Sequence, residues 1–238
     1  MNCLIIAAGT GGRLREIGPT KPLVPLHGVP LLEHVIARAR SAGVARFFVV
    51  SGYRGDEVRA HLDRYSTRES IEIVNIVNES WQRANGVSVL KGKPHLKDPF
   101  LLTMCDHLVD PEILRALTSR PTEPDTVTLA VDFNITDSIN DLEDVTRVKC
   151  SDGRIERVGK KLAEFNAFDT GVFWCTPILF EALEASQAAG DDSLSGAMNV
   201  LARWDKARAF DVEGRLWIDV DDPVYLRKAE ELLAARRL

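Results

Sequence analysis

The sequence predicts an α/β protein with three layers and a mixed, mostly parallel central sheet. In the first half, short apolar runs alternate with helical patterns at the spacing of βαβ units, which build parallel sheets. Polar and glycine-rich segments follow these runs, as expected for a sheet that binds ligands beyond the carboxyl ends of its strands. The expected strands of this half are residues 2–8, 47–50, 71–77 and 100–105, and the expected helices are residues 30–42 and 56–65.

Three dipeptides predict the starts of later helices, because a capping side chain followed by proline suits the first helical turn. They are Asp110-Pro111, Thr176-Pro177 and Asp222-Pro223.

From about residue 132 the pattern is less regular. Strand-like runs occur at residues 126–132, 145–150, 154–158 and 171–175, and a Ser-Asp-Gly turn predicts a hairpin between the second and third runs. We expect a single domain, residues 1–238, that has two halves, residues 1–132 and residues 133–238.

Composition excludes several classes of protein. The chain has 238 residues, and its net charge of −5 is spread along the sequence without a basic stripe, so no nucleic acid is expected as a partner. Its four cysteines form no C-x-x-C pair, which indicates core residues in a reducing compartment. No apolar run approaches the ~20 residues that cross a bilayer, and no secretion signal begins the chain. We therefore expect a cytoplasmic protein with no direct membrane span.

A glycine-rich loop follows the first strand. It reads Ala7-Ala8-Gly9-Thr10-Gly11-Gly12-Arg13-Leu14, and Pro19-Thr20-Lys21-Pro22 comes soon after. Glycines directly after a parallel strand let backbone N–H groups approach phosphate oxygens. Arg13 offers a planar charged fork and Lys21 a point charge, and both suit a polyphosphate. The alternative is a plain glycine turn with solvated charges.

Two better-known phosphate loops do not fit this segment. A Walker loop requires Gly-Lys-Ser/Thr, but Gly12 is followed by Arg13 and Leu14. A dinucleotide fingerprint requires a third glycine at position 14 and a helix that begins there. Leu14 and the proline-bearing segment after it meet neither requirement.

Carboxylates at two places in the chain are candidates for a magnesium site. Mg²⁺ held by one or two carboxylates neutralises phosphate charge during nucleotidyl transfer. Asp106 ends an apolar strand. Asp219, in the segment Trp-Ile-Asp-Val-Asp, is a candidate because it matches the Trp-x-Asp pattern that closes the metal site in the sugar-phosphate nucleotidyltransferase family, which the glycine loop resembles. Asp221 has the same side-chain parity as Asp219 in an extended segment, so it could share or replace that role. Asp110 is explained as a helix cap, and His107 is expected to be structural rather than catalytic.

The segment from Ile5 to Leu14, with Lys21-Pro22 and Pro30-Leu31-Leu32 after it, resembles the sugar-phosphate nucleotidyltransferase family. The resemblance extends over nearly the whole chain. It implies a Rossmann-like nucleotidyltransferase fold, with residues 1–132 as the nucleotide half and residues 133–238 as the acceptor half and closing helix. The implied nucleotide-binding residues of the first segments are Ala7, Ala8, Gly9, Gly11, Gly12, Arg13, Lys21 and Asp106, and the implied magnesium ligands are Asp106 with Asp219 or Asp221.

Three later regions resemble the cytidylyltransferase branch of that family. They are residues 78–88, 141–148 and 159–171. The last two regions are similar to those of inositol-1-phosphate cytidylyltransferases. The resemblance implies nucleotide contacts by Asn78, Glu79, Asn85, Gly86 and Ser88, and acceptor contacts by Asp144, Lys160, Asn166, Asp169 and Thr170. With Arg13 and Lys21, Lys160 completes the expected catalytic set, because it offers a cation for the acceptor phosphate. A solvated lysine beside Lys161 is the alternative.

The sequence therefore predicts a magnesium-dependent enzyme that transfers a cytidylyl group from CTP to a small phosphorylated alcohol. The expected acceptor is myo-inositol 1-phosphate, and the products are CDP-inositol and pyrophosphate. The alternatives are phosphocholine or another small-alcohol phosphate as acceptor, uridylyl or guanylyl transfer to a sugar 1-phosphate, and a catalytically silent nucleotide-sensing subunit. The best-known enzymes of this type carry a fused membrane domain, which these 238 residues lack. We expect the product either to reach a separate membrane-bound transferase or to serve an unrelated pathway.

Overall fold

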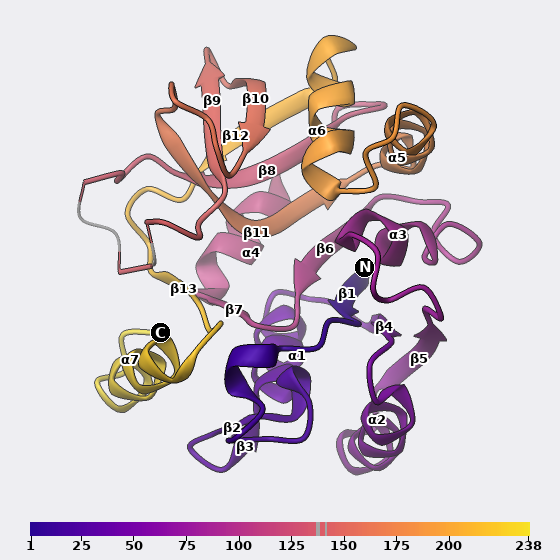
Figure 1. The fold of residues 1–238 in the computed structure, drawn as a ribbon, viewed down its shortest axis with the longest axis vertical. Helices are drawn as coiled ribbons and strands as arrows, with labels where there is room; N and C mark the ends of the chain where they lie inside the picture. Colours follow the sequence, from indigo (N-terminus) through magenta and orange to yellow (C-terminus); the bar gives the residue numbers. More distant parts are fainter. Residues whose placement is uncertain (137–138, 141) are drawn as a thin grey trace.

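A nine-stranded mixed sheet forms the centre of the computed structural model, in the order β5-β4-β1-β6-β11-β8-β12-β10-β9. The structure describes residues 1–136, 139–140 and 142–238, so residue 141, the first of the 141–148 motif, lies outside the described residues. Figure 1 shows the indigo and purple first half below and the orange second half above, and β6 and β11 pair where the halves meet.

The first half of the chain forms the parallel part of this sheet. Its strands match the expected ranges to within one residue at each end and are β1 (Asn2–Ala7), β4 (Arg46–Ser51), β5 (Glu72–Val77) and β6 (Phe100–Met104). All three neighbouring pairs in this part are parallel. The Leu and Ile side chains of β1 are buried on both faces, which explains why the strand is a continuous apolar run.

The second half gives the sheet its mixed character. Its strands are β8 (Val127–Asp132), β9 (Arg147–Ser151), β10 (Arg154–Gly159), β11 (Ala167–Cys175) and β12 (Ala207–Asp211). In the described sheet, β10 and β11 run against the other strands, which share one direction. The expected β9–β10 hairpin turns at Asp152 and Gly153, whose φ angles of 50° and 73° are those of a type I′ turn.

Helices cover both faces of the sheet. They are α1 (Leu31–Ser41), α2 (Gly55–Glu69), α3 (Asn85–Leu90), α4 (Pro111–Ser119), α5 (Ile178–Ala188), α6 (Leu194–Arg203) and α7 (Pro223–Ala234). The apolar side chains of α1, α2, α4 and α7 belong to one core, and those of α3, α5 and α6 belong to a second core. The three-layer α/β fold expected from the sequence is confirmed.

Helices begin at all three expected places, but only two of the three expected side-chain caps form. Asp110 caps α4 by accepting from the N–H of Glu112 (2.9 Å), and Asp222 caps α7 by accepting from the N–H groups of Val224 (2.7 Å) and Tyr225 (3.0 Å). The expectation that Thr176 caps α5 is wrong. Its hydroxyl donates instead to the carbonyl of Thr126 (3.0 Å), and α5 begins without a side-chain cap.

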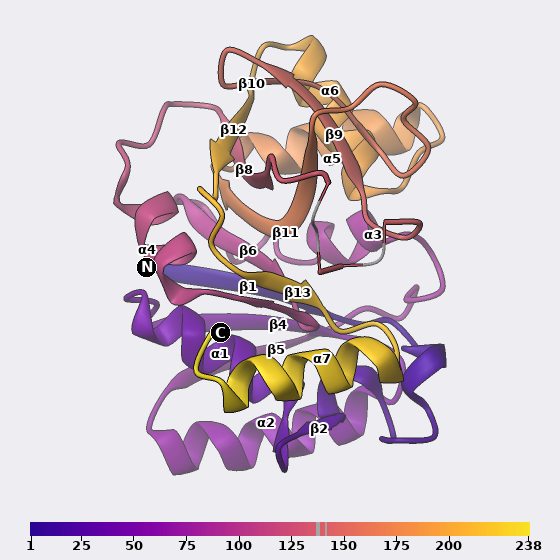
Figure 2. The same ribbon diagram turned by 90° about the vertical axis from the view of Figure 1, so that its left-hand side faces the viewer.

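Short elements bring distant parts of the chain to the carboxyl end of β6. β7 (His107–Val109) pairs antiparallel with β13 (Trp217–Asp219), so a segment near the end of the chain lies beside Asp106. α7 then returns to the first half, where the yellow helix lies beside β2 (Pro25–Leu26) in Figures 1 and 2. The loop after β1 contains two 3-10 helices, η1 (Gly12–Leu14) and η2 (Lys21–Leu23).

The cap of α7 gives a direct test of how the last helix is held. Asp222→Ala should lower the free energy of unfolding by about 1 kcal/mol, because two N–H groups lose their acceptor. Asp222→Asn keeps an acceptor oxygen and should remain close to the wild type. Urea denaturation of the three proteins measures the difference, and equal stabilities for the wild type and Asp222→Ala would contradict the capping role.

Candidate active site

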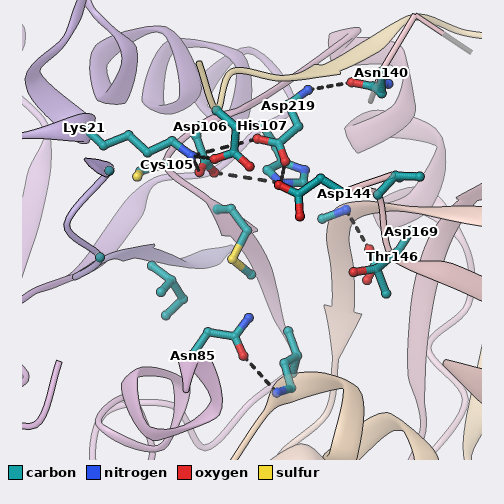
Figure 3. Close-up of a pocket in the computed structure, with 18 of the residues that line it drawn as sticks. Lys21, Asn85, Cys105, Asp106, His107, Asn140, Asp144, Thr146, Asp169 and Asp219 are labelled. Atoms are coloured by element: carbon teal, nitrogen blue, oxygen red, sulfur yellow. Dashed lines mark hydrogen bonds and ion pairs between the residues drawn. The ribbon is translucent and has the colours of Figure 1, made fainter. Parts of the chain in front are cut away.

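A cavity of about 600 Å³ lies between the two halves, beyond the carboxyl ends of β1 and β6. Ligand-binding pockets commonly have this size, and sheets of this kind bind ligands at this edge. Figure 3 shows Lys21 reaching in from one side and Asp144, Thr146 and Asp169 on the other. Asn85 lies at a third side, with a hydrogen bond to the main chain of α6.

Gly11 gives the Lys21 side chain its path into the cavity. Its φ angle is +56°, and a Cβ atom added at this position would clash with the Cβ of Lys21. Glycine avoids both the unfavourable conformation and the clash. Gly9, Gly11, Gly12 and Arg13 all line the cavity, so the glycine loop occupies the expected edge of the sheet.

The ammonium group of Lys21 is buried among three carboxylates. Lys21 is 7% exposed, and its Nζ pairs with Asp106 and Asp221 and lies 4.0 Å from Oδ1 of Asp219. Burial alone would lower the pKa of Lys21, but the three carboxylates outweigh it and hold the pKa above its usual value. Lys21 is therefore a fixed positive charge at physiological pH.

Asp106 and Asp219 converge on the same point. One ligand atom from each of Asp106, His107 and Asp219 lies within 4.8 Å of the others. The pairing of β7 with β13 produces this arrangement, because it places Asp219 directly opposite His107. The expected convergence of the two carboxylates is confirmed.

The ring of His107 is fixed and charged. Its Nδ1 lies 2.8 Å from the carbonyl oxygen of Thr170, and its Nε2 lies 3.5 Å from Oδ2 of Asp219. Gly171, at a φ angle of +74°, leaves room for the ring, since a Cβ atom there would clash with it. Burial would lower the pKa of His107, but Asp219 and Asp106 outweigh it and raise the pKa to about 10.

This cluster fits a divalent cation. Oδ1 of Asp106 and Oδ1 of Asp219 are buried and accept no hydrogen bond within the part of the chain that the structure describes. Burial opposes ionisation of Asp219, but His107 and Lys21 outweigh it and keep the pKa of that carboxyl below its usual range. Ionised carboxylate oxygens without donors are the ligands that Mg²⁺ prefers. Asp221 pairs with Lys21 instead, and burial and the charge of Asp219 raise its pKa.

Asp144 joins two expected catalytic cations that come from opposite halves of the chain. Its carboxylate pairs with Arg13 of the glycine loop and with Lys160, which follows β10. Hydrogen bonds from Lys160 and Arg13 lower the pKa of Asp144 to about 2. Arg13 and Lys160 thus face the same point of the cavity, and a phosphate group there would meet both.

Asn85 and Asp169, two more expected site residues, also line the cavity. The Oδ1 of Asn85 accepts from the N–H of Leu194 (2.9 Å), and Oδ1 of Asp169 accepts from the N–H of Gly171 (2.7 Å). Burial raises the pKa of Asp169 to about 6, although the hydrogen bond from Gly171 opposes the shift.

Several expected binding residues do not belong to the cavity lining. The Nδ2 of Asn78 donates to the hydroxyl of Ser88 (2.9 Å), and both side chains are buried. Asn166 bonds both main-chain groups of Cys150, and the hydroxyl of Thr170 donates to Ala130. The other residues in this group are Ala7, Ala8, Glu79 and Gly86. Contacts of all these residues with substrates stay predictions.

Sequence reasoning missed part of the cavity wall. The missed lining residues include Met104, Asn140, Phe173, Leu194, Ser195 and Tyr225. Met104 and Phe173 belong to strands whose apolar pattern is indistinguishable from that of core residues. The start of α6 could be predicted from the sequence, because Ser193 precedes an apolar helical pattern. In the structure, Ser193 caps α6 by accepting from the N–H of Gly196 (2.9 Å).

A family model described as the MobA-like NTP transferase domain matches residues 3–206. The chain belongs to the MobA-like NTP transferase domain family. The expected nucleotidyltransferase class is thereby confirmed.

This NTP transferase domain is similar to curated proteins named bifunctional IPC transferase and DIPP synthase. The one from Rubrobacter xylanophilus is 35% identical over 233 residues, which are 96% of this chain and 51% of the relative. The one from Aquifex aeolicus is 29% identical over 234 residues, which are 97% of this chain and 51% of the relative. The chain spans about half the length of these relatives.

Solved structures agree with the fold. The inositol-1-phosphate CTP transferase from T. maritima superposes with a TM-score of 0.86 at 25% identity, over 98% of this chain and 94% of that one. A UDP-glucose pyrophosphorylase complexed with UDP-glucose gives a TM-score of 0.82 at 17% identity, over 99% of this chain and 98% of that one. The second likeness supports the fold alone.

The raised pKa of Asp169 predicts how the stability of this NTP transferase domain depends on pH. The folded pKa of about 6 lies above the ordinary value of about 3.9, so between these values the folded state binds the proton more tightly than the unfolded chain. The stabilisation is complete below about pH 4 and is lost as the pH rises through 6. Between pH 4.5 and 7.5, the wild type should lose roughly 1–2 kcal/mol relative to Asp169→Asn, less than the full linkage value because the carboxyl lines an open cavity. Urea denaturation at both pH values measures this, and a difference independent of pH would contradict it.

Proposed function

We propose that this NTP transferase domain transfers a cytidylyl group from CTP to the phosphate of a small alcohol, with myo-inositol 1-phosphate as the acceptor. The choice of nucleotide and acceptor is supported by similarity over nearly the whole chain to an inositol-1-phosphate CTP transferase and to proteins named IPC transferase. The products are a CDP-alcohol and pyrophosphate.

The observation that carries the proposal is the set of cations around one cavity. Arg13 and Lys21 reach it from the first half of the chain and Lys160 from the second, and all three line it. Joining a nucleoside triphosphate to a phosphate monoester brings two polyanions into contact. A site for this reaction needs positive charge on both sides, and this cavity has it.

We assign the two substrates to the two sides of the cavity. The glycine loop and Arg13 bind the triphosphate, and Lys160 binds the acceptor phosphate. Asp144, which pairs with Arg13 and Lys160 in the structure, releases these cations when the phosphates bind. Asp169 and Asn85 remain available to hydroxyl groups and polar edges of the ligands.

Asp106 and Asp219 would hold Mg²⁺, and Lys21 would neutralise Asp221 beside them. When bound there, the ion supplies positive charge to phosphate oxygens, which lowers the repulsion between the reacting groups. The orphaned Oδ1 atoms of Asp106 and Asp219 support this assignment.

The reaction is a single in-line displacement. An oxygen of the acceptor phosphate attacks the α-phosphorus of CTP and forms a new P–O bond. The bond between the α-phosphorus and the oxygen that bridges the α- and β-phosphates breaks. That oxygen keeps the electron pair of the bond and leaves as part of pyrophosphate. No base is required, because a phosphate monoester is mostly ionised at neutral pH. Alignment and charge neutralisation supply the rate enhancement.

The product of this reaction is an activated nucleotide. No helix in the described ranges is long and apolar enough to cross a membrane. We propose that a transferase that displaces CMP from the CDP-alcohol consumes the product, which agrees with the double names of the longer relatives.

Pyrophosphate release tests the proposed function. With Mg²⁺, the four common nucleoside triphosphates should be compared with inositol 1-phosphate, phosphocholine, glucose 1-phosphate and no acceptor. We expect release with CTP and inositol 1-phosphate to exceed every other pair by at least about tenfold, a difference of 1.4 kcal/mol in transition-state binding. Preference for another nucleotide or acceptor would replace the substrate assignment, and release with no pair would refute the enzymatic function.

Lys160 and Lys161 provide a matched pair for the acceptor side. Lys160 lines the cavity and pairs with Asp144, whereas its neighbour Lys161 is exposed and outside the lining. Lys160→Ala should lower kcat/KM for the acceptor by roughly 10- to 150-fold, the value of a charge-assisted contact of ~1.5–3 kcal/mol. Lys161→Ala should change it little. Steady-state kinetics with varied acceptor at saturating CTP measures both, and equal effects would remove Lys160 from the site.

A further inference from the structure

β13, the strand that carries Asp219, is only three residues long and has β7 on one edge. Along a strand, the main-chain hydrogen-bonding groups of successive residues point to opposite edges. Leu216 and Val220 bond toward β7, since the carbonyl of Leu216 accepts from Asp110 (2.9 Å) and the N–H of Val220 donates to Asp106 (3.0 Å). Trp217 and Asp219 therefore present their main-chain groups to the other edge.

The side chain of Asn140 completes that other edge. Its Nδ2 donates to the carbonyl of Trp217 (3.2 Å), and its Oδ1 accepts from the N–H of Asp219 (2.8 Å). Figure 3 shows this second bond reaching the main chain of Asp219. Asn140 is 5% exposed, so water does not compete freely for these bonds. A carboxamide has both the donor and the acceptor that a missing neighbouring strand would supply.

The side chain of Trp217 is held by contacts of its own. Its indole Nε1 donates to Oδ2 of Asp132 (2.9 Å), and its ring stacks on His107 with centroids 6.3 Å apart. The carboxylate of Asp219 has a buried oxygen that accepts no hydrogen bond from the described residues. Its other oxygen, Oδ2, lies 3.5 Å from Nε2 of His107, and the reach of both oxygens toward an ion is set by the main chain of β13, whose outer edge Asn140 holds.

We propose that Asn140 is a positioning residue that fixes the carboxylate of Asp219 for divalent-cation binding. The inference rests on the proposed function, since the cation site is that of the proposed reaction. Two carboxylates bind one ion well only when their oxygens stay within its coordination distance. Without the two hydrogen bonds from Asn140, the outer edge of β13 is no longer held, and β13 can shift relative to β7. The carboxylate of Asp219 then moves relative to Asp106, and the cation binds more weakly. Outer partners that orient metal ligands typically change affinity 10- to 100-fold.

Asn199 is a matched control. It also makes two hydrogen bonds to a main chain, but to a single residue: its Oδ1 accepts from the N–H of Val158 (2.9 Å) and its Nδ2 donates to the carbonyl of Val158 (2.9 Å). Val158 belongs to β10, and neither Asn199 nor Val158 lines the cavity. Asn199→Ala thus removes an equivalent pair of hydrogen bonds without touching the carboxylate cluster.

Direct titration with Mn²⁺, followed by electron paramagnetic resonance of the free ion, tests the inference without turnover. Asn140→Ala should weaken Mn²⁺ binding by at least about tenfold, and Asn199→Ala should leave it within about twofold of the wild type. Circular dichroism checks that each variant folds. If Asn140→Ala does not fold, Asn140→Ser, which keeps one hydrogen-bonding group, should weaken binding in the same direction. Folded Asn140 variants that bind Mn²⁺ like the wild type, or equal losses in the Asn199 variant, would overturn the inference.

Kinetics separate a positioning role from a general structural one. In the folded Asn140 variant, the Mg²⁺ concentration for half-maximal activity should rise by about the same factor as the Mn²⁺ dissociation constant. The KM for the acceptor at saturating Mg²⁺ should stay near the wild-type value. A raised acceptor KM with unchanged Mg²⁺ dependence would overturn the positioning role. If the wild type binds Mn²⁺ but transfers no cytidylyl group, the proposed function fails while the binding comparison still decides the role of Asn140.

Discussion

The buried ammonium of Lys21 holds three distant stretches of chain at one point. Lys21 lies in η2, Asp106 ends the parallel block of the sheet, and Asp219 and Asp221 precede the last helix. Buried charges of one sign are costly without partners, so each side of this cluster requires the other. Gly11 leaves space for the side chain of Lys21, and the pairing of β13 with β7 brings Asp219 beside Asp106. Both segments line the cavity between the halves. The same charges that fix the fold at this edge define the site.

The cluster also restricts the chemistry. The pKa of Lys21 is held above its usual value, and that of His107 is raised to about 10, because carboxylates surround both. Lys21 pairs with Asp106 and Asp221, and both ring nitrogens of His107 face oxygen atoms, so neither group is placed as a nucleophile or general base. The acceptor phosphate is itself an ionised nucleophile, and the protein supplies position and charge. The charged groups of the site therefore suit a direct displacement by the acceptor phosphate.

The sequence predicts the first half of the fold and the centre of the site well, and the second half less well. Parallel strands buried on both faces leave a clear apolar pattern, and Asp106 is found because it lies two residues beyond the end of one of them. Asn78 and Ser88 carry the expected motif, yet they bond to each other in the interior, because side-chain direction depends on packing that a motif does not record. Asn140 carries no motif at all. Its role depends on a contact with β13 between residues 77 positions apart, which exists only in the folded chain.

The central claim is that a single displacement on the α-phosphorus occurs among fixed charges, with no covalent enzyme intermediate. Its most direct test is the stereochemistry of transfer from CTP that carries a sulfur of known configuration on the α-phosphorus. One in-line displacement predicts inversion at phosphorus in the CDP-alcohol, which phosphorus NMR of the product can assign. Retention of configuration would show two successive displacements. It would require a protein nucleophile in the cavity and would contradict the single displacement.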